Sequence, residues 1–595
     1  MPRSGSEPHD TPRELTARGF LLGIALALIL GAANAYLGLY AGMTVSASIP
    51  AAVISMAILR ALGGSTILEN NFVQTVASAG EAVAAGAIFT FPALVILGGG
   101  AHLPYLEVTA LSAAGATMGS LLVVFLRRPY IVEEQLPFPE GLACAEVLRT
   151  GESSASAAPL LWGGIISAVL KAAQDVLGVI PGTLGFGRWI GAAAVSGSIN
   201  VSAALLGVGY IVGIRIAALV FAGGAFAWLV AIPLVTMSHH SSSTIDAVTA
   251  ASRVWSGQVR YLGVGAMLVG GLVTLWRLRV RIGAAIRDSL VAIRERHTAV
   301  TAREDTDLPA PIVVGAVAMC APVIFAISLA LGASLALSLT LAVALIVIAF
   351  FATAIAGYLT GIVGASNNPV SGVTVIVLLA VALVLQMMGV TRDVGPALAI
   401  SVGAIVCTAA AMAGDSLHDL ATGHHVGATP RNLEIGVLTG AIASSFLMAP
   451  ILNLLISGYG IAGTATARNG ALSAPQAFLM AKVAQGVFAG GLPWLTISVG
   501  AALAVLLAIV DRQLERRGAK WRTPIMPVAL GLYLPFGLSV AIALGALLRE
   551  LSSPNDSREA GPGLLFAAGL VAGEALMGVA SGALVTAGVR LPLLR

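Results

Sequence analysis

The chain has 595 residues, of which 57% are hydrophobic and only 10% are charged. Soluble domains carry about 25% charged residues, so this composition excludes a soluble globular protein and predicts a multi-pass membrane protein. The formal net charge of +4 comes from basic residues clustered in short segments between apolar runs. That pattern is a topology signal and gives no reason to expect nucleic acid as a partner.

Apolar runs of membrane-spanning length follow one another through most of the chain. Crossing a bilayer takes about 20 mostly apolar residues per helix, which gives about 14–16 transmembrane helices here. We therefore predict an all-α polytopic bundle with discontinuous or re-entrant segments where Gly or Pro interrupts a run. The candidate spans begin near Phe20, Val45, Val83, Leu106, Leu160, Ile211, Tyr261, Pro311, Leu335, Val373, Val394, Ile435, Ala477, Leu495, Met526 and Leu564.

The chain divides into four regions at its polar segments. A polar tail covers residues 1–16, an N-terminal transmembrane half covers 17–276, and a C-terminal transmembrane half covers 309–595. Between the halves lies an Arg-rich linker, 277–308, which we expect to form an amphipathic helix on the membrane surface. The positive-inside rule places this linker and the basic loop Asp511–Arg522 in the cytoplasm, and we place the tail there too.

The first segment with clear polar chemistry is Glu69–Glu81. Asn71, Gln74 and Ser78 are spaced to share one helical face, with Glu81 near the same stripe. This face either lines a polar path, with Glu81 as a proton acceptor and Asn71 and Gln74 in contact with the substrate, or forms a hydrogen-bonded seam between helices. The segment Asn70–Pro92 around it is expected to be discontinuous.

Two further segments of the N-terminal half contain features of local interest. Pro139 and Glu140 begin a short helix, where Glu140 either caps the first turn or contacts the substrate. The Gly- and Ser-rich stretch Gly182–Asn200 suggests a re-entrant hairpin. Lys171 and Asp175, four residues apart in an apolar run, are expected to pair with each other.

The segment Gly357–Gly372 reads as a second broken span. It contains four glycines and the run Ser366-Asn367-Asn368-Pro369. Such a tip offers amides and hydroxyls to a polar substrate without adding charge, and we assign Asn368 and Ser371 to substrate binding. The alternative is a turn at the membrane surface.

The most informative segment follows the apolar run Val394–Ala413. Asp415, His418 and Asp419 are spaced to project from one side of a helix, and an Asp at membrane depth costs about 2.5–3.5 kcal/mol on insertion scales. Such groups usually handle ions, protons or polar solutes, which predicts a transporter. A proton relay, a divalent-cation site and a solvated loop without chemistry are the three interpretations of this cluster.

A weak internal similarity links the two halves. Tyr36-Leu37 followed by Gly42 resembles Tyr358-Leu359 followed by Gly364, and in each half a Gly-acid pair follows, Gly80-Glu81 and Gly414-Asp415. Pairs of interrupted segments are where repeat-built transporters place their sites. The similarity therefore suggests a two-half repeat and makes Glu81 and Asp415 counterparts.

Taken together, these motifs resemble the oligopeptide transporter family, whose other branch contains the yellow-stripe-like metal-chelate carriers. The matching segments run in the family's order from the first span to the last. They are Asn34–Leu39, Asn71–Thr75, Gly80-Glu81, Phe89–Leu94, Pro139–Gly141, Cys144–Glu146, Asn368-Pro369, Ser371-Gly372, Gly414-Asp415, Asp419-Leu420, Thr422-Gly423, Gly427–Pro430, Gly531–Pro535 and Ala572–Gly578.

The resemblance implies a secondary active, proton-coupled importer of small peptides or peptide-like solutes in the bacterial inner membrane. The proposed coupling residues are Glu81, Asp415, His418 and Asp419, and Glu574 joins the substrate-binding group. His418 and Ala421 depart from the Gln and Lys expected there, which should alter local proton affinity.

Two alternatives to a peptide importer stay open. One is a metal-chelate symporter for iron-siderophore or nicotianamine-like solutes, and a distant one is a membrane-embedded metal-dependent hydrolase. No enzyme activity, cofactor or bound metal is expected, and the three cysteines predict neither a disulfide framework nor a zinc site. The partners are protons, the solute and the lipid bilayer, with a homo-oligomer compatible with the sequence.

Overall fold

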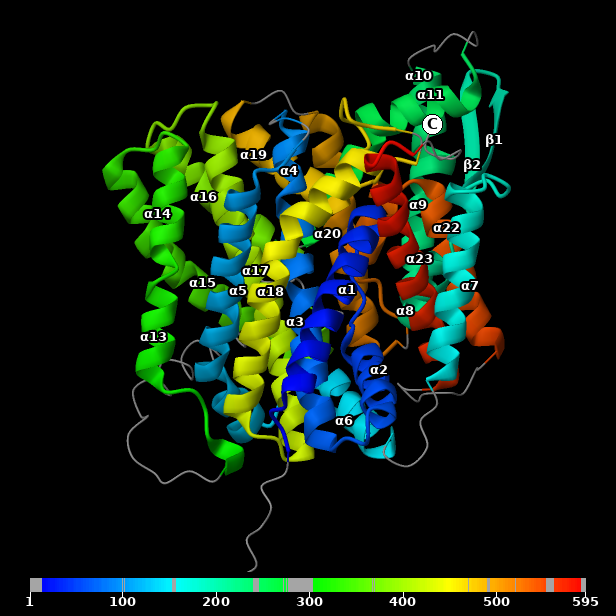
Figure 1. The fold of residues 1–595 in the computed structure, drawn as a ribbon. Helices are drawn as coiled ribbons and strands as arrows, with labels where there is room; N and C mark the ends of the chain where they lie inside the picture. The colour runs from blue at the N-terminus through cyan, green and yellow to red at the C-terminus, as the bar shows by residue number, and fades with distance from the viewer. Residues whose placement is uncertain are drawn as a thin grey trace, which may run out of the picture.

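The protein is an all-α bundle that is long enough to span a bilayer (Figure 1). In this computed structural model the described residues are 13–98, 100, 102–151, 157–238, 245–270, 272–273, 276, 303–365, 368, 370–468, 470–489, 493–519, 521–552 and 561–589. Eleven helices in these ranges are long and apolar enough to cross a membrane. This confirms the prediction of an all-α polytopic membrane protein.

The N-terminal half begins with six helices. α5 continues into a π-helical turn, Arg128–Glu133. The six are α1 (Ala17–Ala41), α2 (Ser48–Ala61), α3 (Ile67–Thr90), α4 (Pro92–Ile96), α5 (Tyr105–Arg127) and α6 (Pro139–Gly151).

The rest of the N-terminal half contains the two strands that the described residues form. π-helical turns at Phe226–Ala231 and Trp255–Val259 extend two of its helices, and residues 260–270 continue helically. The elements are α7 (Ala158–Asp175), β1 (Thr183–Ile190), β2 (Ala193–Asn200), α8 (Ala203–Val212), α9 (Ile214–Ala225), α10 (Ile232–Ser238) and α11 (Ala247–Val254).

The described end of the linker forms a 3-10 turn, Arg303–Asp305, and the C-terminal half that follows contains eleven helices in the described residues. They are α13 (Ala310–Ala318), α14 (Ala321–Ala330), α15 (Leu335–Val363), α16 (Val370–Met387), α17 (Gly395–Val426), α18 (Pro430–Tyr459), α19 (Pro475–Phe488), α20 (Trp494–Arg516), α21 (Ile525–Tyr533), α22 (Phe536–Ser552) and α23 (Pro562–Thr586). Several candidate spans of the sequence correspond to short helices, such as α2, α19 and α21, so the described residues contain fewer helices of spanning length, eleven, than the 14–16 predicted.

The bundle has a central group of long helices and a flank on each side (Figure 1). α1, α3, α5, α17 and α18 pack against one another in the centre, and α13 to α15 form one flank. α7, α8, α9, α22 and α23 form the other flank, where α23 packs along α7. The core between the central helices is mostly apolar, with a few buried polar side chains on α3 and α17.

Small residues set the spacing of the central helices. A Cβ added at Gly80 of α3 would lie 2.1 Å from the carbonyl oxygen of Ala27 on α1, and one added at Gly86 would lie 2.4 Å from Thr408 of α17. Close approach through glycine is how transmembrane helices gain packing contacts. The expectation that Asn70–Pro92 is discontinuous is wrong up to Thr90, because these glycines serve packing and α3 bends only at Pro92.

The stretch Gly182–Asn200 forms an antiparallel β-hairpin, and the expectation of a re-entrant hairpin is wrong. β1 pairs with β2 from Thr183↔Asn200 to Ile190↔Ala193, and Gly191 in the turn adopts a φ of 60°. β2 packs against α10, α11 and α22, whereas β1 is exposed along most of its length. The hairpin lies at one end of the bundle, beyond the spans (Figure 1).

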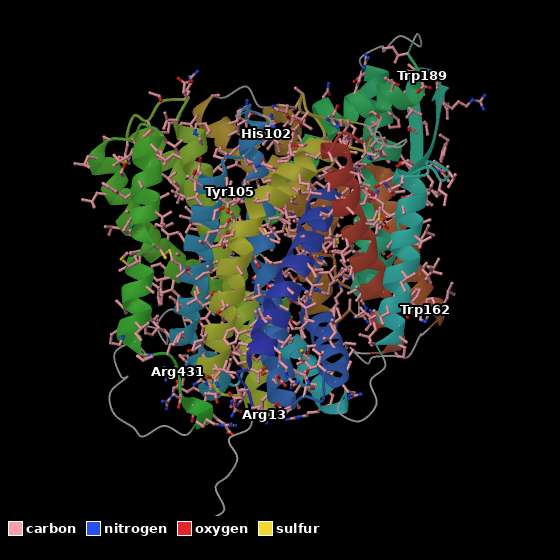
Figure 2. All side chains as sticks on the ribbon, in the orientation of Figure 1. Arg13, His102, Tyr105, Trp162, Trp189 and Arg431 are labelled. Atoms are coloured by element: carbon pink, nitrogen blue, oxygen red, sulfur yellow. The ribbon has the colours of Figure 1, made fainter. Side chains whose placement is uncertain are left out.

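The two ends of the bundle differ in their chemistry. Arg13 and Arg431 lie at the end that we call the lower face, and His102 and Trp189 lie at the opposite, upper face (Figure 2). Arg303 Nη1 contacts Glu14 Oε1 at 3.2 Å, so the start of the described chain and the end of the linker share the lower face. Residues 277–302, where the linker helix is expected, lie outside the described residues.

Candidate functional site

Two helices next to the central group, α2 and α16, begin inside the bundle instead of at its faces. α2 begins at Ser48, next to Glu81 in the middle of α3, and runs to the lower face. α16 begins at Val370, on the wall of the cavity that also contains Asp415 of α17, and runs to the upper face. Each is preceded by a long helix that ends at a glycine with positive φ, Gly42 (75°) and Gly364 (89°).

The order of these elements is the same in both halves, but their direction is reversed. α1, α2 and α3 correspond to α15, α16 and α17, and α3 runs antiparallel to α17, since Gly86 lies at Thr408 and Gln74 at Asp419. Such reversed counterparts are expected of an inverted repeat, and the two-half repeat stays a prediction. The arrangement matches the internal similarity of the sequence, with the helix-ending glycines and the two acids at corresponding places.

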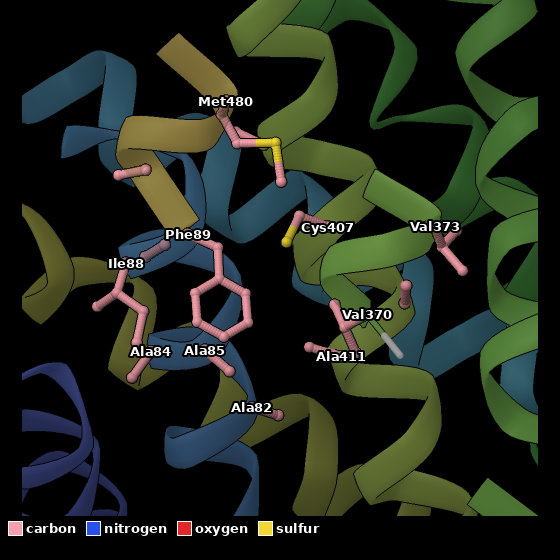
Figure 3. Packing of buried hydrophobic residues seen from close by; sticks show 14 of the residues in the cluster. Ala82, Ala84, Ala85, Ile88, Phe89, Val370, Val373, Cys407, Ala411 and Met480 are labelled. Atoms are coloured by element: carbon pink, nitrogen blue, oxygen red, sulfur yellow. The ribbon is translucent and has the colours of Figure 1, made fainter. Parts of the chain in front are cut away.

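A central cavity of about 160 Å³ lies where α2 and α16 begin. Four of the predicted site residues line it, namely Glu81, Asp415, Asn368 and Ser371. Figure 3 shows Phe89 of α3 on one side, with Val370 and Ala411 on the other. The remaining wall consists of Gly42, Met43, Thr44, Ser46, Ala85, Ala365 and Gln476.

Glu81 is hydrogen-bonded to the backbone at the start of α2. Its Oε2 accepts a hydrogen bond from the backbone N–H of Ala47, the residue before α2. The N-terminus of a helix carries partial positive charge, which stabilises a nearby carboxylate. Glu81 therefore sits where a carboxylate is held by backbone dipoles instead of by a basic side chain.

Asn368, in the loop before α16, packs closely against Gly414 of α17. A Cβ added at Gly414 would lie 2.4 Å from Asn368 Nδ2 and 2.7 Å from Thr360 Oγ1. Among the described residues, Asn368 Oδ1 and Thr360 Oγ1 are buried without a hydrogen-bond partner. The neighbouring residues Ser366, Asn367 and Pro369 lie outside the described residues. The predicted break at Gly357–Gly372 is confirmed, because α15 ends at Val363 and α16 begins at Val370.

Asp419 is buried one helical turn below Asp415 and does not line the central cavity. Its Oδ1 accepts hydrogen bonds from Gln74 Nε2 (2.5 Å) and Ser48 Oγ (3.3 Å). Asn71 Nδ2 in turn donates to Gln74 Oε1 at 3.1 Å. Asn71 and Gln74 therefore form the hydrogen-bonded seam between α3 and α17, and their role in substrate binding stays a prediction.

His418 and Glu140 line a different cavity, the lower chamber, of about 440 Å³. His418 Nδ1 lies 4.0 Å from Asp419 Oδ1, and neither ring nitrogen has a hydrogen-bond partner among the described residues. Thr422 Oγ1 donates to Gly141 O at 3.1 Å and so fastens α6 to α17. Asp415, His418 and Asp419 share one turn of helix but face three different surroundings.

One short loop separates the central cavity from the lower chamber. Met43, Thr44 and Ser46 line both. On the far side of the lower chamber, Arg549 Nη1 binds the carbonyl oxygens of Tyr210 and Ile211 at 3.2 and 3.0 Å, at the end of α8. Sequence reasoning did not assign a role to this loop, although Gly42 and Pro50 at its borders indicate an interrupted helix.

Glu574 does not join the central cluster. Its Oε1 accepts from Ser202 Oγ at 2.7 Å and its Oε2 from the backbone N–H of Ala204 at 2.8 Å, so it caps the start of α8. The predicted pair of Lys171 and Asp175 is confirmed at 3.1 Å. Lys171 lines a third cavity, distinct from the central one, whose wall includes Thr183, Ser198 and Asn200 of the hairpin.

No group of three or more His, Cys, Asp or Glu side chains suited to a metal ion occurs in the described ranges.

A model of the family described as "OPT oligopeptide transporter protein" matches residues 14–585. The chain belongs to the oligopeptide transporter family. It is also 33% identical over 593 residues to a Haemophilus influenzae protein named "Putative oligopeptide transporter", covering 93% of each chain.

Membership of the oligopeptide transporter family confirms the resemblance drawn from the scattered motifs. The match spans both halves and the linker between them, so the central cavity, the lower chamber and the hairpin all lie within the family region. The closer relation to the yellow-stripe-like branch stays a prediction.

Proposed function

We propose that the protein is a secondary active importer that carries short peptides across the plasma membrane and is driven by protons. The observation that carries this proposal is the central cavity, where Glu81 and Asp415 from the two halves of the chain meet the starts of α2 and α16. Family membership and the name of the Haemophilus influenzae relative support peptides as the solute.

The proposed roles follow from placement. Glu81 and Asp415 take up and release the coupling proton, because they are the two carboxylates on the cavity wall. Asn368 and Ser371, at the start of α16, contact the solute. Asp419 and His418 lie next along α17 toward the lower chamber and continue the proton path to the cytoplasm.

Alternating access gives this arrangement its direction. Transporters built from inverted repeats expose a central site to each face in turn by moving one unit against the other. Here the loop with Met43, Thr44 and Ser46 is the barrier between the cavity and the lower chamber. We propose that its displacement opens the cavity to the cytoplasm.

The test is uptake into proteoliposomes containing the purified protein. Labelled dipeptides to pentapeptides, glutathione and a ferric chelate are offered with an inward proton gradient, with no gradient, and with a protonophore. The proposal expects saturable peptide uptake that the gradient raises and the protonophore abolishes. Peptide uptake that ignores the gradient would remove the proton coupling, and uptake of the ferric chelate alone would replace the peptide by a metal chelate.

A further inference from the structure

A third cavity, the upper chamber, lies beneath the β-hairpin and has a volume of about 380 Å³. Its wall combines aromatic rings with one buried cation, a composition absent from the central cavity wall. Ligand pockets in proteins span roughly 300–1,000 Å³, so the space accommodates a small solute. Tyr36, Tyr40, Lys171, Asn200 and Tyr459 are the lining residues that matter here.

Lys171 is the group that calls for a ligand. The residue is 6% exposed, and its Nζ lies 3.1 Å from Asp175 Oδ1 and 5.9 Å from the ring centroids of both Tyr36 and Tyr459. A lysine ammonium has three N–H donors. Within the described chain, Asp175 is the one ion-pair partner found for it, so donors remain that face the chamber.

Apart from Asp175 Oδ1, which pairs with Lys171 itself at 3.1 Å, the carboxylate oxygens around Lys171 bind other protein groups. Asp175 Oδ2 accepts from the Tyr459 hydroxyl at 3.2 Å. Both oxygens of Glu574 are occupied by Ser202 and Ala204 at the start of α8. A buried donor left without an acceptor is costly, and a carboxylate oxygen from a solute would complete the coordination of Lys171.

The hairpin covers this chamber from the upper face. Thr183 of β1 and Ser198 and Asn200 of β2 belong to its wall. The Tyr40 hydroxyl donates to Asn200 Oδ1 at 2.7 Å, which links the end of α1 to the end of the hairpin. The chamber therefore lies opposite the arginine-rich lower face, on the side from which an importer receives its solute.

We propose that the upper chamber is an entry site in which Lys171 binds the terminal carboxylate of a short peptide while the tyrosine rings pack against its apolar atoms. This inference rests on the proposed function, since it assumes a peptide as the solute. It adds a second site, separate from the central cavity, and a recognition element, the carboxylate.

The experiment pairs a change in the protein with a change in the ligand. Uptake of labelled tri-alanine into proteoliposomes is inhibited by unlabelled tri-alanine or by tri-alanine amide, which lacks the carboxylate. Wild type is expected to prefer the acid by about tenfold or more, as for a charge-assisted hydrogen bond. In Lys171→Met the acid should lose this advantage, whereas inhibition by the amide should stay unchanged.

Two further variants control the comparison. Lys482→Met removes the half-buried lysine of α19, which pairs with Gln485 at 2.8 Å, and should keep the wild-type preference. Lys171→Arg keeps the positive charge and should retain most of it. Equal inhibition by acid and amide in wild type, or an unchanged preference in Lys171→Met, overturns the entry site while peptide transport stands. Absence of any peptide uptake by wild type overturns the proposed function and this site with it.

Discussion

At the scale of single residues, the proposed mechanism depends on the two carboxylates of the central cavity. Glu81 and Asp415 are far apart in the chain, but the sequence already pairs them, because each follows a glycine downstream of a Tyr-Leu motif. The structure places both on one wall. Their convergence was therefore predictable, and the hydrogen bond from Ala47 to Glu81 was not, since it depends on where α2 begins.

Replacing either carboxylate by its amide should separate coupling from transport. In Glu81→Gln and Asp415→Asn the shape of the side chain is kept and the titratable proton is lost, so gradient-driven accumulation of tri-alanine should fall to the level without a gradient. Exchange of peptide across the membrane at equal pH should continue. Both quantities are measured in proteoliposomes.

The matched control is Glu107→Gln. Glu107 lies on α5, near Ser401 Oγ at 3.5 Å, and does not line the central cavity. This variant should accumulate peptide like wild type. Gradient-driven accumulation that survives in both Glu81→Gln and Asp415→Asn would contradict the assigned coupling role.

Other residues of the predicted site could not be placed without coordinates. Glu574 reads in sequence as an isolated acid in an apolar span, but Ser202, whose hydroxyl it binds, lies 372 positions earlier in the chain. Asp419 is next to His418 in sequence, yet it faces the seam with Gln74 while His418 faces the lower chamber. Spacing along a helix predicts direction only approximately, and neighbouring helices decide the environment.

At the scale of elements, local signals distinguished some helix breaks and confused others. The break after α15 was predicted because four glycines and an Asn-Pro pair cluster there. The break between α1 and α2 lacks such a cluster. Conversely, Gly80 and Gly86 suggested a break in α3, but they are contact points between continuous helices. Glycine alone does not tell a bend from a close approach.

The packing role of Gly80 has a direct consequence for stability. A methyl group there would lie 2.1 Å from the Ala27 carbonyl oxygen, so Gly80→Ala must force α1 and α3 apart. Overpacking of this kind costs about 1–3 kcal/mol. We expect a lower melting temperature in detergent, measured by intrinsic fluorescence on heating.

Gly315→Ala is the matched control for that measurement. Gly315 lies within α13, where an added Cβ would meet nothing within 4 Å. Because alanine favours the helix over glycine by about 0.5–1 kcal/mol, this variant should melt at the wild-type temperature or slightly above it. If Gly80→Ala melted no lower than Gly315→Ala, the close approach of α1 and α3 would be refuted.

At the scale of the whole molecule, most of the architecture could be predicted from the sequence, and the β-hairpin could not. The class, the many apolar spans and the family were all accessible from composition and motifs, because they depend on the residues present and not on their neighbours. The β-hairpin was not, since its Gly- and Ser-rich sequence lacks the strongly alternating pattern of a typical strand. Its pairing depends on the surface that α10, α11 and α22 provide for β2.

Orientation in the membrane is tested by cysteine labelling. The three native cysteines are buried, so a membrane-impermeant maleimide should label them little. His102→Cys and Arg431→Cys place a thiol at the exposed upper and lower faces, respectively. In intact cells we expect labelling of His102→Cys, and of Arg431→Cys only after permeabilisation. The reverse pattern would invert the topology and with it the direction of import.

The wall shared by the central cavity and the lower chamber is one peptide chain thick, because Met43, Thr44 and Ser46 face both. Molecules bound in the two spaces therefore contact the same loop, and the binding of one changes the affinity for the other. Thermodynamic reciprocity requires that whatever a cytoplasmic compound does to the affinity for an extracellular one, the second does equally to the first. A compound bound in the lower chamber would thus act as an allosteric inhibitor of binding in the central cavity. Its affinity would depend on which of the two spaces this loop is displaced toward.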